Sequence, residues 1–159
     1  ASVRVPMLIR APMLGREQTM IGGNFSHIDL APTIMDLMGE RVPERMQGRS
    51  RVPILNGTED LADNDIFIQW NGRDGHPPAS IGEAEVNRSM GEPYRTIVIS
   101  DRWKLNLYTR GQNELYDLNT DPYEMNNLID TSEHNTRIHD LTDRIRRWQE
   151  ETGDRSPNQ

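Results

Sequence analysis

The sequence predicts an α+β fold in which a four-stranded antiparallel sheet packs against a C-terminal helix. Three strand-like segments follow one another at residues 94–99, 103–108 and 114–118, and a fourth precedes them at 66–71. Short polar turns separate the last three, which is typical of an antiparallel meander. The closing segment, at about 135–151, carries apolar residues at helical spacing on one face: Ile138, Leu141, Ile145 and Trp148.

The first part of the chain predicts a strand and a connector. Residues 3–10 predict a buried strand, because Val3, Val5, Leu8 and Ile9 are apolar and arginines flank them. A core strand that begins at the third residue favours a polypeptide that extends upstream. Residues 40–60 have no periodicity and contain two prolines and two glycines, so they predict an ordered connector between two lobes.

A helix is predicted over residues 29–38. Pro32 is tolerated only in a first helical turn, where its missing N–H would be unpaired anyway, so we expect Asp29 rather than Ser26 as the N-cap residue. Gly39 suits the position that follows the helix. The apolar residues of this helix should form a buried stripe: Leu30, Ala31, Ile34, Met35, Leu37 and Met38.

Composition excludes several classes of protein. The chain has 159 residues, a formal net charge of −7 and no basic run longer than Arg146-Arg147, which argues against nucleic acid as a partner. Its longest apolar runs are far shorter than a membrane span needs. The absence of cysteine excludes a disulfide scaffold and a cysteine nucleophile on this chain. Only 34% of the residues are hydrophobic, so either much of the chain is loop or its folded form is covered by something else.

One loop carries the candidate binding residues. The strand at 66–71 delivers Trp70 and Asn71 into a loop that contains two glycines, Arg73 and His76. A tryptophan with an asparagine suits a sugar ring, and an arginine with a histidine suits an anionic group. The alternative interpretation is a strand end whose tryptophan packs in the core while the loop only meets solvent.

No residue pattern predicts a catalytic or metal site. The four histidines, at 27, 76, 134 and 139, form no metal-binding pair with a carboxylate. Asp60, Asp63 and Asp65 alternate as calcium ligands can, but the glycine and terminal glutamate of a calcium-binding loop are missing. No nucleophile elbow or phosphate-binding glycine loop is present.

Several segments resemble the sulfatase family, in the family's order and from residue 3 to about residue 150. Residues 4–12 (RVPMLIRAP), 27–39 (starting HIDLAPT) and 47–50 (QGRS) resemble the later part of its catalytic domain. Residues 102–105 (RWKL), 114–118 (ELYDL) and 121–128 (DPYEMNNL) resemble its C-terminal subdomain. By this resemblance, residues 1–60 would end the α/β catalytic domain and residues 61–159 would form the C-terminal subdomain.

The resemblance implies an activity that this chain does not perform alone. Intact relatives in the alkaline phosphatase superfamily hydrolyse sulfate esters or sulfamates with a formylglycine nucleophile and a calcium ion. The motifs that supply both lie upstream of the part matched here, so we expect no catalytic residue, no metal ligand and no cofactor on this chain. Many relatives carry arginine in the strand where this chain has Thr96 and Ile99, and Arg95 lies one position out of register.

The resemblance also implies partners. They would be the N-terminal catalytic portion of the same polypeptide and a sulfated small molecule or glycan, with the loop at 70–78 as one wall of the pocket. Family members are often exported or periplasmic. Two alternatives remain open: a non-catalytic module that binds sulfated glycans, and a subdomain that only buttresses a catalytic lobe. Phosphoesterases and phosphonate hydrolases of the same superfamily also fit.

Overall fold

The computed structural model describes residues 5–15, 17–71, 92–109 and 111–154. It divides into two compact units, Ala1–Leu61 and Ala62–Gln159, which we call unit 1 and unit 2 and describe separately.

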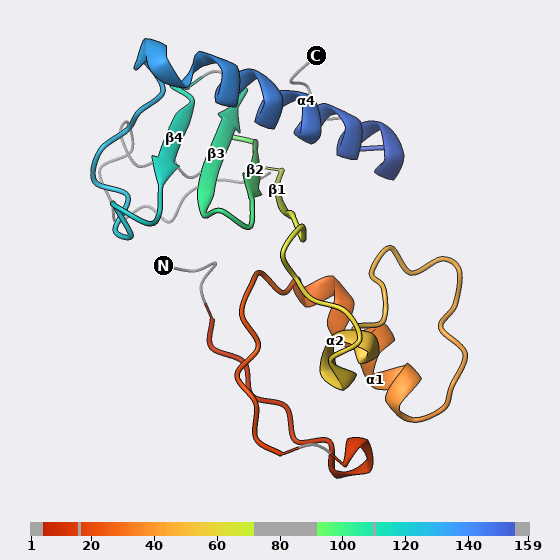
Figure 1. Ribbon diagram of the computed structural model, residues 1–159. Helices are drawn as coiled ribbons and strands as arrows, with labels where there is room; N and C mark the ends of the chain where they lie inside the picture. The colour runs from red at the N-terminus through yellow and green to blue at the C-terminus, as the bar shows by residue number, and fades with distance from the viewer. Residues whose placement is uncertain (1–4, 16, 72–91, 110, 155–159) are drawn as a thin grey trace, which may run out of the picture. The chain divides into compact units, whose positions relative to one another are not determined.

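Unit 2 is a four-stranded antiparallel sheet with a long helix across one face (Figure 1). The strands lie in sequence order and the helix closes the chain: β1 (Ile66–Trp70), β2 (Tyr94–Val98), β3 (Trp103–Tyr108), β4 (Glu114–Asp117) and α4 (Asn135–Thr152). A short 3-10 turn, Ser132–His134, leads into α4. The predicted α+β fold, with its antiparallel sheet against a C-terminal helix, is confirmed.

The core of unit 2 lies between the sheet and α4. Strand register places Ile97 opposite Leu105, and Leu105 opposite Leu115, in one row across the sheet. Leu141 and Ile145 of α4 pack on this row, and all five side chains are fully buried. The side chains of a strand alternate between its two faces. The immediate sequence neighbours of this row therefore point away from α4.

Unit 1 has little regular structure. Its elements are the 3-10 turns Pro12–Leu14 and His27–Asp29 and the helices α1 (Leu30–Leu37) and α2 (Val52–Asn56). The helix predicted at 29–38 is confirmed within one residue at each end. Gly39 follows it with φ of +74°, as a residue after a helix end requires. Helix α2 interrupts the region predicted to be a connector.

The strand predicted at 3–10 is wrong for the residues that the structure describes. Residues 5–10 carry no strand. A strand is defined by hydrogen bonds to a neighbouring strand, and the described part of unit 1 contains none to pair with. Pro6 also lacks the backbone N–H that a ladder needs. Leu8 is 94% exposed instead of buried.

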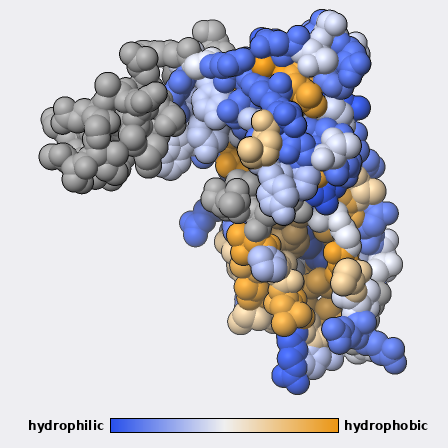
Figure 2. All heavy atoms as spheres, turned by 90° about the vertical axis from the view of Figure 1, so that its left-hand side faces the viewer, coloured by the Kyte–Doolittle hydropathy of each residue, from blue (hydrophilic) through white to orange (hydrophobic). Residues whose placement is uncertain are grey.

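Many large apolar side chains of unit 1 are exposed to solvent. On α1, Leu30, Ile34 and Met38 are 37%, 47% and 70% exposed, so the stripe predicted to be core faces solvent, and Pro32 and Thr33 are buried in its place. Figure 2 shows hydrophobic side chains gathered over the lower part of the view. Exposed apolar residues in this number are unusual for a monomer and typical of a surface that another segment covers.

Candidate functional site

The structure describes two of the four candidate binding residues. Trp70 ends β1 and Asn71 follows it, while Arg73 and His76 lie outside the described residues. Trp70 is 41% exposed and is not in the core. Phe67 packs on the core beneath α4, and Trp70 lies three residues further along the same strand. Because strand side chains alternate between the two faces, the ring of Trp70 lies on the sheet face away from α4.

Asn71 lies on the side of the sheet that carries α4. Its Oδ1 accepts hydrogen bonds from Gln69 Nε2 and Arg95 Nη2, both at 2.9 Å. Gln69 and Arg95 are opposite one another in the β1–β2 register, on the same face as the core row. The structure therefore does not bring Trp70 and Asn71 to one face, and a ligand bound by one need not contact the other.

Arg95 is the residue that sequence reasoning missed. It is 2% exposed, and its guanidinium forms a two-pronged ion pair with Asp154, which follows the C-terminal end of α4. Its Nη1 donates to the carbonyl oxygens of Trp70 and Tyr94, at 3.0 and 2.9 Å. Arg95 thus joins the end of β1 to the end of α4.

The ion pair makes a pH-dependent contribution to stability. Hydrogen bonding from Arg95 holds the pKa of Asp154 below its ordinary value of 3.8. A lowered carboxyl pKa stabilises the folded state above 3.8, and this stabilisation is lost as the pH falls through the folded-state pKa. We expect Asp154→Asn to lower the free energy of unfolding by about 1–3 kcal/mol at pH 7. Urea unfolding of both proteins from pH 7 to pH 2 should show the difference shrinking below pH 4; a difference that is constant with pH would contradict this origin.

A second buried ion pair lies in unit 1, where two of the sulfatase-like segments meet. Asp29 and Arg51 are 3% and 4% exposed, and Asp29 Oδ2 lies 2.7 Å from Arg51 Nε and 2.6 Å from Nη2. The backbone N–H of Arg49 donates to Asp29 Oδ1 at 3.0 Å. Asp29 is the N-cap residue by position, as predicted, but its side chain bonds the segment at 49–51 and caps nothing.

Gly48 lets the two segments approach. A Cβ atom added there would lie 1.9 Å from the carbonyl oxygen of Ile28, so only glycine fits. Thr33 completes the contact: its hydroxyl donates to the carbonyl of Asp29 and accepts from the N–H of Arg51. With its carboxylate occupied by these donors, Asp29 is a structural residue and has no role as a metal ligand here.

The segment at 113–129 is held by side-chain-to-backbone bonds. Asn127 Oδ1 accepts from the N–H groups of Leu115 and Ile129, and its Nδ2 donates to the carbonyl of Asn113. Asp121 accepts from the N–H of Asn126, which lowers the pKa of its carboxyl. The family-like residues of this segment therefore fix the loop against β4.

Asn127→Ala should lower the free energy of unfolding by about 1–3 kcal/mol, because the half-buried N–H of Leu115 loses its side-chain acceptor. Thermal or urea unfolding of the chain measures the loss. Asn126→Ala is the matched control, because Asn126 bonds Asp121 through its backbone N–H and this bond survives the substitution; it should change stability by less than about 0.5 kcal/mol. Equal losses for the two variants would contradict the assignment.

On the sheet face away from α4, polar side chains form a chain across three strands. Thr96 donates to Asn106 Oδ1, Asn106 Nδ2 donates to Glu114 Oε2 at 2.7 Å, and Tyr108 also donates to Glu114 at 3.2 Å. Burial and Glu114 raise the pKa of Tyr108 far above its ordinary value, and they raise that of Tyr116 to about 12. Both tyrosines are therefore protonated donors at neutral pH and neither is a ready nucleophile.

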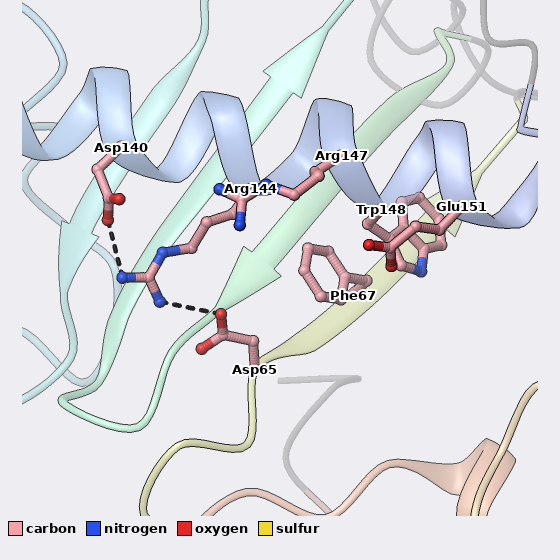
Figure 3. Close-up of a pocket in the computed structure, with 7 residues that line it drawn as sticks. All are labelled: Asp65, Phe67, Asp140, Arg144, Arg147, Trp148 and Glu151. Atoms are coloured by element: carbon pink, nitrogen blue, oxygen red, sulfur yellow. Dashed lines mark hydrogen bonds and ion pairs between the residues drawn. The ribbon is translucent and has the colours of Figure 1, made fainter.

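A hollow of about 310 Å³ lies between α4 and β1 (Figure 3). Its floor is the stacked pair of Phe67 and Trp148, with ring centroids 5.2 Å apart. Arg144 bridges Asp65 and Asp140, each at 3.0 Å, and the hydrogen bond to Asp65 raises the pKa of this guanidinium. The hollow contains no nucleophile paired with a base, so it supports no catalytic role.

The described residues do not fit the metal centre that the resemblance implies for intact relatives. Within the described ranges, no group of three or more His, Asp or Glu side chains is placed to hold a metal ion. The sequence has no cysteine from which formylglycine could be made. No helix among the described residues is long and apolar enough to cross a membrane.

Comparison with known proteins defines the class. The chain is 30% identical over 127 residues to the uncharacterized sulfatase YidJ of Escherichia coli, covering 80% of this chain and 22% of that protein. It is 28% identical over 158 residues to an N-acetylglucosamine-6-O-sulfatase of Bacteroides thetaiotaomicron, covering 98% of this chain and 26% of that protein. The chain thus spans about a quarter of the length of these relatives, and the class is a C-terminal region of sulfatases.

Solved structures share the fold. A protein bound to its substrate D-glucosamine-2-N,6-O-disulfate superposes with a TM-score of 0.63 at 23% identity, over 82% of this chain and 25% of that one. The phosphonate monoester hydrolase of Agrobacterium radiobacter superposes with a TM-score of 0.58 at 23% identity, over 77% of this chain and 24% of that one. A protein with a disulfated sugar as substrate and a phosphonate hydrolase therefore share this fold, and the fold alone does not separate their activities.

Residues 1–151 match the family model described as N-sulphoglucosamine sulphohydrolase, C-terminal. The chain belongs to this family of sulfatase C-terminal domains.

Proposed function

We propose that this chain is the C-terminal part of a hydrolase of sulfate esters or sulfamates, and that it forms one wall of the substrate pocket. The match of residues 1–151 to the family carries the proposal. In this role the chain supplies neither nucleophile nor metal ligands; in an intact enzyme a calcium ion would polarise the sulfate and a formylglycine would attack it, both upstream. The first sixty residues complete the catalytic domain, and the rest forms the C-terminal subdomain.

The partner is the N-terminal portion of the same polypeptide. The open apolar surface of unit 1 supports this, because the stripe of α1 and the segment at 5–13 have no cover among the described residues. The relatives span about four times the length of this chain, which leaves ample polypeptide to supply that cover.

The ligand is a sulfated sugar. Support comes from the names of the relatives, which include an N-acetylglucosamine-6-O-sulfatase, and from the exposed Asn71 that follows β1. The alternative of a buttress without ligand contact is favoured by Asp29 and Asn127, whose polar atoms are used within the fold.

The test is expression of the full reading frame that contains this chain, with sulfate release from N-acetylglucosamine 6-sulfate and 4-nitrophenyl sulfate as the assay. We expect the full protein to release sulfate and the 159-residue chain to release none. Activity of the chain alone, or a reading frame that starts at its first residue, would overturn the proposal. Separately, Arg73→Ala and His76→Ala in the full protein should lower kcat/KM if the loop contacts substrate, and unchanged kinetics would favour the buttress.

A further inference from the structure

We infer that Arg95 and Asp154 are positioning residues for sugar recognition, and that they act by orienting the amide of Asn71 at the pocket wall. This inference rests on the proposed function. The recognition group is an amide N–H that donates to a sugar hydroxyl, and Arg95 and Asp154 hold it in place.

The guanidinium of Arg95 is fully used within the fold. Its five N–H groups meet five acceptor contacts: two with the carboxylate of Asp154, one each with the carbonyls of Trp70 and Tyr94, and one with Asn71 Oδ1. A side chain that is 2% exposed and saturated in this way has no donor left for a ligand. Arg95 can therefore influence binding only through the groups that it holds.

Asn71 is the group on which these contacts converge. Its Oδ1 accepts from Arg95 and from Gln69, and Gln69 also donates to Asp154 at 3.3 Å. Two donors on Oδ1 fix which end of the amide faces them, so Nδ2 is turned away from the cluster. Among the described residues, Asn71 Nδ2 donates no hydrogen bond to Gln69, Arg95 or Asp154, and Asn71 is exposed. The exposed end of this amide is a donor.

A fixed N–H donor selects oxygen acceptors. The sulfate group of a substrate belongs to the upstream centre in the proposed enzyme, so the acceptor left for Asn71 is a hydroxyl or ring oxygen of the sugar. Lysine could not replace Arg95 in this arrangement. The three donors of one ammonium cannot reach Asp154, two carbonyls and Asn71, whereas the five donors of the planar guanidinium do. The position of the arginine, opposite Gln69 in the register, is therefore part of the site.

The experiment is a double-mutant cycle in the full-length protein with Asn71→Ala, Arg95→Lys and the double variant. With N-acetylglucosamine 6-sulfate, we expect each single variant to lower kcat/KM about tenfold and the double variant to be no worse than either. With 4-nitrophenyl sulfate, which has no sugar hydroxyl, all three variants should lose much less of their kcat/KM than they do with the sugar. Arg144→Lys is the control, since Arg144 also forms two ion pairs but contacts Asp65 and Asp140 instead of Asn71. It should leave kcat/KM unchanged for both substrates.

The outcomes separate the inference from the proposed function. If the two single losses in kcat/KM multiply in the double variant, Arg95 acts independently of Asn71 and the inference is overturned. Equal losses in kcat/KM with both substrates would show a general structural role for Arg95 and would overturn it too. Unchanged kinetics for Asn71→Ala would overturn it as well, while sulfate release by the wild type would leave the proposed function standing. If Arg95→Lys does not fold, Asp154→Asn replaces it in the cycle, because it weakens the hold on Arg95 and keeps the side-chain shape.

Discussion

Asp29→Ala should lower the free energy of unfolding by about 3–5 kcal/mol. The substitution removes the carboxylate that accepts from the guanidinium of Arg51, which is 4% exposed, and it removes the side-chain acceptor of the Arg49 N–H. Removing one partner of a buried ion pair costs far more than the intact pair contributes. Urea unfolding of the chain measures the loss, and hydrogen exchange at the amides of residues 49 and 51 should become faster.

Two further variants locate the cause. Asp29→Leu combined with Arg51→Met should recover most of the stability, because replacing both partners leaves no charge of the pair buried. Asp36→Ala, in helix α1 at an exposed position where the carboxylate accepts from the Ser50 hydroxyl, should cost about 1 kcal/mol or less. A loss for Asp29→Ala no larger than that for Asp36→Ala would contradict the buried pair.

Leu141→Ala should lower the free energy of unfolding by about 2–5 kcal/mol. Leu141 is fully buried between α4 and the row formed by Ile97, Leu105 and Leu115. Truncation removes apolar contact and leaves a cavity that the sheet cannot close, since three strands fix the opposite wall. Loss of α4 signal in far-ultraviolet circular dichroism during urea unfolding gives the midpoint.

The matched controls for Leu141→Ala vary burial. Ile145→Val removes a single methylene from the same core and should cost about 0.5–1.5 kcal/mol. Met125→Ala, at a side chain that is 78% exposed, should change stability by less than about 0.5 kcal/mol. The core assignment would be wrong if Met125→Ala cost as much as Leu141→Ala.

Strand periodicity and turn chemistry were enough to predict the sheet. The strand at 103–108 is confirmed at both ends, and the other three within one residue, because the polar turns between them leave little choice of boundary. The closing helix is also within one residue of its predicted end. These elements are local in sequence or pair with their neighbours, so local patterns determine them.

The same reasoning failed at residues 5–10 and at the stripe of α1. In both places apolar residues were interpreted as buried, but burial depends on what lies opposite, and the pattern of one segment does not contain that information. Leu8 and Met38 are apolar in the expected positions and exposed in the structure. An apolar pattern predicts side chains that pack against another segment, but it does not identify that segment.

The candidate site was predicted only in part for a related reason. Asn71 was found because polar residues follow a strand, whereas Arg95 lies inside a strand, where an arginine suggests a solvent-facing position. Its partner, Asp154, is 59 residues away. The one available signal was an arginine beside the positions where relatives carry one. The pairing of Asp29 with Arg51 was equally hidden, because Asp29 already had a satisfactory explanation as a helix cap.

The ion pair between Arg95 and Asp154 has a consequence for where the chain can be cut. The family match ends at residue 151, and helix α4 ends at Thr152, so either would look like a natural boundary for an expression fragment. Both cuts remove Asp154 and leave a buried guanidinium beneath the end of β1. A fragment should therefore keep residue 154, because a residue that unit 2 needs lies beyond the last residue of its helix.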